Sequence, residues 1–157
     1  MEVMKIKKGT CLQRSGVYNT CVYEVVSGLL RCYTIDKKGR EYTFMFAPEG
    51  WIVADATPST LPAELYIEAL EDTEVRIRKK ELIGTESQLQ AISKRMWVLQ
   101  QRVIMLMSYT GLERYEHFLQ TYPSLVQRVS QKMIASYLGM TPEALSKAKH
   151  DALRSNS

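Results

Sequence analysis

The spacing of apolar residues changes near residue 80 of this chain. Before that point, apolar residues form short runs, rich in β-branched and aromatic side chains and bounded by turn residues, a pattern typical of strands. Tyr42, Phe44 and Phe46 occupy alternate positions and are expected to share one face. Turn signals about every eight to twelve residues favour an antiparallel sandwich or barrel over βαβ units. The predicted strands are residues 21–36, interrupted at Ser27-Gly28, and residues 41–46, 65–70 and 74–79.

A single long helix is predicted over residues 86–108, which contain no Pro or Gly. Six apolar residues there are spaced 3, 4, 3, 4, 3, as in the a/d seam of a coiled coil. The seam favours pairing with the same helix of a second chain, and packing on the chain's own β region is the alternative. Further apolar residues predict that a second face is also buried, with Trp97 and Met105 resting on the β region. The seam consists of Leu89, Ile92, Met96, Leu99, Val103 and Leu106, and the further residues are Trp97, Val98, Met105 and Met107.

The segment "SQKMIASYLGMTPEALSKAKH", residues 130–150, has the spacing of a helix-turn-helix. Ala135 is small where the second helix must approach the first. Gly139 follows where the turn needs a left-handed backbone, which glycine adopts without strain. Leu145 is placed to point back at the first helix. A preceding helix is predicted over residues 112–123, ending at Pro123.

The second helix of this segment begins with strong start signals. Thr141 is a good N-cap, Pro142 suits the first helical position, and Glu143 favours the positive end of the helix dipole. Its outward side chains can meet base edges or phosphates; they are Thr141, Glu143, Ser146, Lys147 and Lys149. A hairpin used only for packing is the alternative. From residue 124 onward the chain has five Lys or Arg residues and two acidic residues. Because this excess of positive charge is small, each monomer is expected to bind DNA weakly.

Composition narrows the function classes. The net charge of +4 permits a polyanionic partner without requiring one, and no apolar run resembles a signal peptide or a membrane span, so a cytoplasmic protein is expected. Cys11, Cys21 and Cys32 belong to no CxxC or Cys/His cluster and are expected to be inert, with no metal or cofactor. Because residues 1–116 contain no His, a metalloenzyme on a cupin-like barrel is disfavoured.

The chain as a whole resembles the Crp/Fnr family of bacterial transcription regulators. Three stretches are similar to the cyclic-nucleotide-binding-like β-roll of that family: "KKGTCLQRSG" to its opening strands, residues 22–51 to its body and residues 67–82 to its last strands. The helix over 86–108 is similar to the dimerisation helix, and "VSQKMIASYLGMTPEALSK" to the DNA-binding helices. "VSGLLR" and "IASYLGMTPEALSK" are the most specific of these stretches.

The resemblance implies an α+β fold with an antiparallel, jelly-roll-like β-roll sensor over residues 1–85, a dimerisation helix over 86–108 and a helix-turn-helix domain over 109–157. The chain starts almost at the first strand and ends soon after the recognition helix, so neither the leading helix nor a full wing is expected.

The resemblance also assigns roles within a recognition helix at about residues 141–150. The expected base contacts are Thr141, Pro142, Glu143, Ser146 and Lys147. The expected phosphate contacts are Ser130, Lys132 and Lys149.

One region departs from the family pattern. Cyclic-nucleotide-binding members carry a Gly-Glu pair and a later Arg-Ser or Arg-Thr, whereas residues 54–66 here read "ADATPSTLPAELY". No Arg or Lys lies between Glu41 and Val75. A buried cyclic phosphate needs a cation to replace its hydration, so cyclic AMP is not the expected effector, which stays unknown.

The expected function is therefore a homodimeric, sequence-specific DNA-binding transcriptional regulator that is not an enzyme. Its expected partners are a palindromic DNA site and a second copy of itself, with RNA polymerase a candidate and no membrane association. The alternative is a small-molecule sensor or protein-interaction module whose helix-turn-helix is vestigial.

Overall fold

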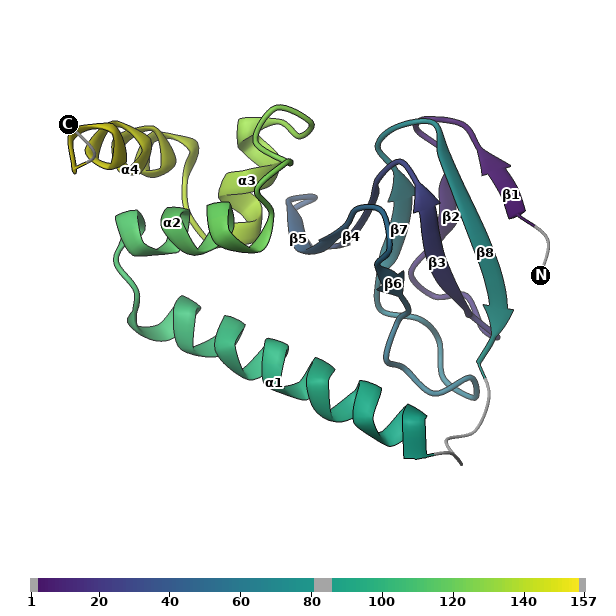
Figure 1. The fold of residues 1–157 in the computed structure, drawn as a ribbon. Helices are drawn as coiled ribbons and strands as arrows, with labels where there is room; N and C mark the ends of the chain where they lie inside the picture. The colour runs from purple at the N-terminus through teal and green to yellow at the C-terminus, as the bar shows by residue number, and fades with distance from the viewer. Residues whose placement is uncertain (1–2, 81–85, 156–157) are drawn as a thin grey trace. The chain divides into compact units, whose positions relative to one another are not determined.

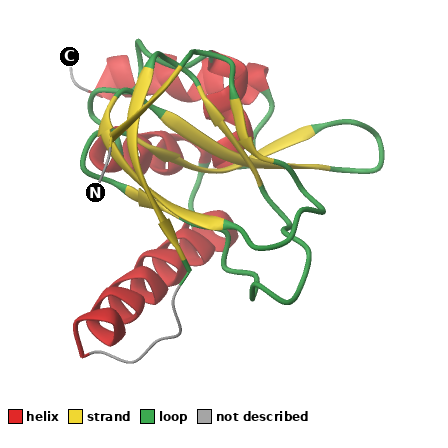
Figure 2. Ribbon diagram, turned by 90° about the vertical axis from the view of Figure 1, so that its right-hand side faces the viewer, coloured by secondary structure: helices red, strands yellow, loops and turns green. Residues whose placement is uncertain are grey.

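Within the described residues, the strands of this protein all lie before residue 80. The computed structural model describes residues 3–80 and 86–155 and divides into two units, Met1–Glu81 and Leu82–Ser157 (Figure 1). Figure 2 shows strands confined to the first unit and helices to the second. The strands are β1 (Val3–Ile6), β2 (Cys11–Gln13), β3 (Cys21–Ser27), β4 (Leu30–Ile35), β5 (Glu41–Ala47), β6 (Ile52–Val53), β7 (Tyr66–Ala69) and β8 (Thr73–Lys79).

Two four-stranded antiparallel sheets form the first unit, in the orders β1-β8-β3-β6 and β2-β7-β4-β5. Inward residues of both sheets build one core, in which Val25 pairs with Val75 in one sheet and Cys32 pairs with Ile67 in the other. The core consists of Tyr23, Val25, Leu30, Cys32, Ala47, Val53, Ile67, Ala69 and Val75. This arrangement confirms the predicted antiparallel β fold and the four predicted strand regions, while β1 and the two-residue strand β6 lie outside the predicted ranges.

The predicted face of β5 was wrong. Cys32 pairs with Met45 and Tyr33 with Thr43, so Phe44 is the extra residue of a β-bulge. The bulge reverses the alternation: Phe46 lies opposite Arg31, on the other face of β5 from Met45 and Ala47, where it is fully buried, and Tyr42 is 41% exposed. A bulge depends on the partner strand, so the alternation within β5 alone could not reveal it.

The predicted break between β3 and β4 is a turn that requires glycine. Gly28 has φ +89°, and a Cβ built on it would lie 2.7 Å from the Asp72 carbonyl oxygen. Leu29 N–H donates to Thr73 Oγ1 nearby. The turn is therefore closed against the start of β8 by backbone that leaves no room for a side chain.

Four helices form the second unit: α1 (Glu86–Ser108), α2 (Gly111–Thr121), α3 (Gln131–Leu138) and α4 (Pro142–Ser155). The predicted helix over 86–108 is confirmed at both ends. A capping box begins α2, in which Thr110 and Glu113 each accept a backbone N–H from the other residue. The α+β class, with antiparallel sheets followed by helices, is confirmed. No helix among residues 3–80 and 86–155 is long and apolar enough to span a membrane.

Candidate nucleic-acid interface

The turn between α3 and α4 has the predicted construction. Gly139 adopts φ 62° and ψ 38°, and its N–H bonds back into the last turn of α3. Met140 N–H donates to Ala135 O at 2.9 Å, which completes a Schellman-type ending. Ala135 is buried, as its predicted role at the close approach of two helices requires.

Helix α4 begins sharply after this turn. Thr141 Oγ1 accepts the N–H of Ala144 at 3.2 Å and its carbonyl accepts the N–H of Leu145, so Thr141 is the N-cap and Pro142 the first helical residue, both as predicted. The helix was expected to end near residue 150 but continues to Ser155. The extension follows because Ala152 adds another turn to the buried stripe.

Helix α4 has one buried and one exposed face. Leu145, Ala148 and Ala152 are buried at helical spacing. The predicted base-contact residues all lie outside that stripe and are exposed: Thr141, Pro142, Glu143, Ser146 and Lys147. No hydrogen bond or ion pair to the side chains of Glu143, Ser146 or Lys147 is found in the described part of the chain, although Glu143 and Lys147 are one turn apart. Their polar groups are exposed to water and can therefore form hydrogen bonds with another molecule.

The predicted phosphate-contact residues lie at the start of α3 and on the flank of α4. Ser130 caps α3 by accepting the N–H of Met133 at 3.2 Å, and Lys132 is exposed. Lys149 is half-buried, and its Nζ donates to Gln131 Oε1 at 3.1 Å.

Sequence reasoning missed three residues beside the predicted contacts: Gln131 at the start of α3, and His150 and Leu153 on α4. Gln131, His150 and Leu153 join Pro142, Ser146 and Lys149 around a depression of about 490 Å³ between the start of α3 and α4. The spacing along α4 could have revealed this face, because residues three or four apart lie side by side on a helix. The residues with this spacing are Pro142, Ser146, Lys149 and Leu153. The side chains of Gln131 and His150 therefore lie beside the predicted reading face.

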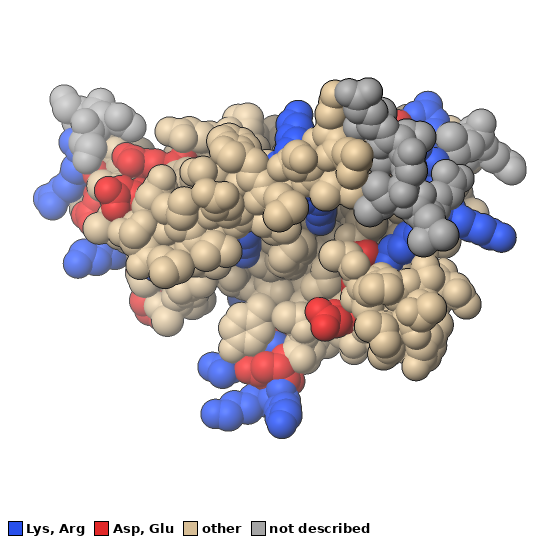
Figure 3. Space-filling view, turned by 90° about the horizontal axis from the view of Figure 1, so that it is seen from below, with Lys and Arg blue, Asp and Glu red and all other residues tan. Residues whose placement is uncertain are grey.

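Helix α1 exposes a broad apolar face. The predicted seam residues Leu89, Ile92, Met96 and Val103 are exposed, Met96 at 66%, whereas Leu99 and Leu106 are half-buried. Of the further apolar residues, Trp97, Val98 and Met107 are exposed and Met105 is buried. The packing of Trp97 and Met105 on the β region stays a prediction. At about 100° per residue, Ile104 and Trp97 extend the stripe to one side of Met96. In Figure 3, much of the surface of α1 is free of charged residues.

The loop that follows β6 is organised by one buried carboxylate. Asp55 accepts backbone N–H groups of Thr57, Glu64 and Leu65 at 2.7–2.9 Å. Gln13 Nε2 lies 3.4 Å from the same carboxylate. Burial raises the pKa of Asp55, but hydrogen bonds from Thr57, Leu65 and Glu64 outweigh burial and hold the pKa below its ordinary value. An ionised carboxylate of the chain itself thus occupies the loop.

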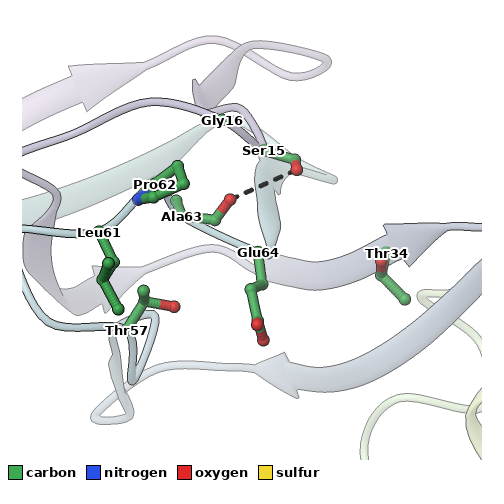
Figure 4. Close-up of a pocket in the computed structure, with 8 residues that line it drawn as sticks. All are labelled: Ser15, Gly16, Thr34, Thr57, Leu61, Pro62, Ala63 and Glu64. Atoms are coloured by element: carbon green, nitrogen blue, oxygen red, sulfur yellow. Dashed lines mark hydrogen bonds between the residues drawn. The ribbon is translucent and has the colours of Figure 1, made fainter.

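Beside this loop lies an open pocket of about 590 Å³ (Figure 4). Figure 4 shows Glu64 projecting between Thr57 and Thr34, with Ser15 bonded to the Ala63 carbonyl. The other lining residues are Gly16, Leu61 and Pro62. Glu64 is the ionisable residue of this lining. A cation does lie near the loop, because Lys80 Nζ donates to the Thr57 carbonyl at 2.8 Å. The tertiary structure brings Lys80 there from outside the stretch that lacks Lys and Arg.

The three cysteines are free thiols, and no group of three or more potential metal-ligating side chains occurs within residues 3–80 and 86–155.

The comparisons with known proteins rest on structure. No protein-family model and no curated protein sequence matches the chain. FixK2 from Bradyrhizobium japonicum superposes with TM-score 0.73 and 22% identity, over 99% of this chain and 85% of that one. TTHA1359, a Crp/Fnr-family transcriptional regulator from Thermus thermophilus, superposes with TM-score 0.76 and 16% identity, over 98% of this chain and 87% of that one. The chain has the Crp/Fnr fold. The c-di-GMP-responsive regulator CLP of Xanthomonas campestris has the same fold, at TM-score 0.71 and 15% identity, over 99% of this chain and 87% of CLP.

The Crp/Fnr fold accounts for the order of the elements described above. Strands come first, then the long α1, then the α3–α4 hairpin, as the resemblance implied. In this fold the loop after β6 is the region where the sequence departs from the cyclic-nucleotide-binding pattern, and Asp55 stands at its centre.

Proposed function

We propose that this protein is a homodimeric, sequence-specific DNA-binding transcriptional regulator of the Crp/Fnr type. The observation that carries the proposal is the face of α4, where Glu143, Ser146 and Lys147 are exposed on a helix held rigidly by its buried stripe. Such a helix, starting directly after a tight turn, is the form in which helix-turn-helix proteins present side chains to the major groove. We assign residues 1–85 to a sensor, 86–108 to dimerisation and 109–157 to DNA binding.

The chemistry of the exposed side chains indicates what each would read. The Glu143 carboxylate can accept a hydrogen bond from a cytosine amino group, and Lys147 can donate to guanine O6 or N7. Pro142 offers an apolar contact to a thymine methyl group. Lys132 and Ser130 are suited to phosphates, which fix register without specifying sequence. Lys149 would join them by exchanging Gln131 for a phosphate oxygen.

The exposed face of α1 supports the dimeric part of the proposal. Leu89, Ile92, Met96 and Val103 place a continuous apolar stripe in water, which an identical helix would cover. A two-fold dimer carries two copies of α4. Such a pair reads a palindrome whose half-site centres lie about 34 Å apart, one turn of the duplex.

The sensor has no assigned effector. The pocket is lined by the Glu64 carboxylate, and Asp55 fills the adjacent loop with a second carboxylate, against the ammonium group of Lys80 at the Thr57 carbonyl. Both features disfavour an anionic ligand such as cyclic AMP, so an uncharged molecule is the better candidate. RNA polymerase stays a candidate protein partner.

The test is selection from random duplexes with the full chain, followed by binding of the enriched duplex at several salt concentrations. We expect an enriched palindrome and an affinity that falls steeply with salt, because phosphate contacts release counterions. If no palindrome is enriched, and random duplexes bind without salt dependence, the vestigial alternative holds. The thin basic surface and the pairing of Lys149 with Gln131 are the observations that favour that alternative.

A further inference from the structure

Two arginines connect the end of α3 to the preceding helices of the same unit. Arg102 on α1 donates through Nη2 to the carbonyl of Tyr137 at 2.9 Å. Its guanidinium carbon lies 3.9 Å from the centroid of the Tyr137 ring. The ring in turn packs edge-on against Phe118 and Tyr122, with centroids 5.8 and 5.5 Å away. Arg102 is thus fixed both to the backbone of α3 and to an aromatic cluster.

Arg114, on α2, binds three segments with one guanidinium group. Nη2 donates to Leu106 O at 2.8 Å, in the last turn of α1, and Nε donates to Tyr109 O at 3.1 Å. Nη1 donates to Leu138 O at 3.0 Å, at the end of α3. Carbonyls at the ends of helices lack partners within the helix, and cations are favoured there by the helix dipole. Neither α1 nor α3 has a basic residue in its own last turn, so Arg114 supplies the cation to both ends.

The turn that precedes α4 lies directly against this junction. A Cβ built on Gly139 would be 3.2 Å from Leu106 Cδ2 and 3.6 Å from Arg114 Nη1. The α3–α4 turn is therefore packed on the last turn of α1, where Arg114 holds both. A single guanidinium can do this because its five N–H donors form a rigid planar fork, which a lysine ammonium cannot reproduce.

We propose that Arg102 and Arg114 are positioning residues, which fix the α3–α4 hairpin on α1 and thereby set the half-site spacing that the dimer accepts. This inference rests on the proposed function. Each base pair added between half-sites turns one of them by about 34–36° around the duplex. A hairpin held at a fixed angle on α1 tolerates little such rotation. A hairpin that is free to rotate on α1 would contact the same bases, but it would bind half-sites at several different spacings.

The experiment compares the wild-type full chain with Arg102→Met, Arg114→Met and the double variant, with Arg14→Met as the matched control, because Arg14 is exposed in the first unit. Duplexes carry the selected half-sites at the best spacing and at one or two base pairs more or less. The wild type and the control are expected to lose at least about 30-fold in affinity per base-pair change, and the double variant at most about 5-fold. Affinity for an isolated half-site should stay within about 3-fold in all proteins.

A second measurement needs no DNA. Spin labels at Lys94→Cys on α1 and Ala144→Cys on α4, with the three native cysteines replaced by alanine, report the distance between these helices. Mixing labelled chains with excess unlabelled chains isolates the distance within one subunit. The double variant should at least double the width of the distance distribution, since a purely stabilising arginine would leave the width unchanged in the folded protein.

The outcomes separate the two proposals. If the wild type selects no palindrome, the proposed function fails, and the distance distributions alone decide the positioning role. If the wild type has a sharp spacing preference and the variants keep both that preference and a narrow distribution, the positioning role is overturned and the proposed function stands. Should the methionine variants fail to fold, Arg102→Lys retains the charge near Tyr137. Broadening in that variant supports the inference, and unchanged width and spacing reject it.

Discussion

The loop after β6 and the exposed face of α4 differ in where their polar groups form hydrogen bonds. In the loop, the Asp55 carboxylate accepts three backbone N–H groups and is buried. On α4, Glu143 and Lys147 sit one turn apart, are exposed and make no ion pair with each other. The loop has therefore satisfied within the chain the donors that a bound anion would otherwise satisfy. Helix α4 leaves its hydrogen-bonding capacity to something outside the chain.

The difference indicates where binding energy is available. Displacing Asp55 from its donors would leave either the carboxylate or the N–H groups unsatisfied, so an anionic ligand gains little there. Glu143 and Lys147 lose only water when they bind a base edge. The apolar face of α1 resembles α4 in this respect, because Met96 and Val103 are exposed and would gain burial from a partner helix. The helical unit thus holds the surfaces that need partners.

The largest expected effect concerns the face of α1. Met96→Glu combined with Val103→Glu should raise the dissociation constant of the dimer at least about 1000-fold, about 4 kcal/mol, because like charges would meet across a dry two-fold interface. Sedimentation equilibrium measures the change. Gln90→Glu is the control, since residue 90 lies about 120° around the helix from Met96. A double variant that sediments as an unchanged dimer would remove α1 from the interface.

The loop side of the comparison is tested by Asp55→Ala. Its loss leaves three partly buried backbone donors without their acceptor, and the free energy of unfolding should fall by about 2–4 kcal/mol. Urea denaturation measures the change. Asp72→Ala is the control, because Asp72 also accepts a backbone N–H, from Lys8, but is exposed. Equal losses in the two variants would mean that burial of Asp55 adds nothing.

The same carboxylate predicts a pH dependence. Because the pKa of Asp55 is lowered in the folded state, its stabilisation is present above the unfolded value of about 3.9 and is lost as pH falls through the folded pKa. The difference in unfolding free energy between wild type and Asp55→Asn should be constant from about pH 7 to pH 5 and shrink below about pH 4. A difference that grows on acidification would contradict the assignment.

On α4, Glu143→Ala and Lys147→Ala should each lose about 1–3 kcal/mol for the selected site and relax base preference at one position. Repeating the selection with each variant measures both effects. Lys38→Ala controls for the loss of one lysine, since Lys38 is exposed in the first unit. An unchanged motif with Lys147→Ala would show that α4 is not the reading helix.

Lys132→Ala should have a smaller and different effect. A phosphate contact carries no sequence information, so all duplexes should bind more weakly by a similar factor, and the salt dependence should flatten by about one unit per subunit. Affinities measured from low to high salt test this. Altered base preference would instead place Lys132 at a base edge.

The last prediction is that cyclic AMP has no effect on thermal stability. Millimolar cyclic AMP should leave the melting temperature unchanged, because Glu64 lines the open pocket and Asp55 already occupies the backbone donors of the adjacent loop. A ligand at 100 times its dissociation constant would add about 2.7 kcal/mol. A reproducible rise of several degrees would show that the loop opens to anions after all.

The sequence by itself determined the elements whose signals are local. Thr141, Pro142 and Gly139 act through backbone conformations and caps within a few residues of themselves, so the start of α4 and the turn before it were predictable. The same holds for α1, which lacks Pro and Gly, and for the turn at Gly28. Hydrophobic spacing also determined that α4 has one buried stripe, because Leu145 and Ala148 follow the helical period.

Only the tertiary structure decided features that depend on residues distant in the chain. The bulge at Phe44 depends on pairing with β4, and Lys80 reaches the loop after β6 through the path of β8. The exposure of Trp97 and Met107 depends on what the rest of the chain covers, which periodicity within α1 does not contain. Arg114 bonds to carbonyls of Leu106 and Leu138, and backbone acceptors carry no side-chain signature. Contacts to backbone and across strands are set by the fold, so they become visible only when the elements are assembled.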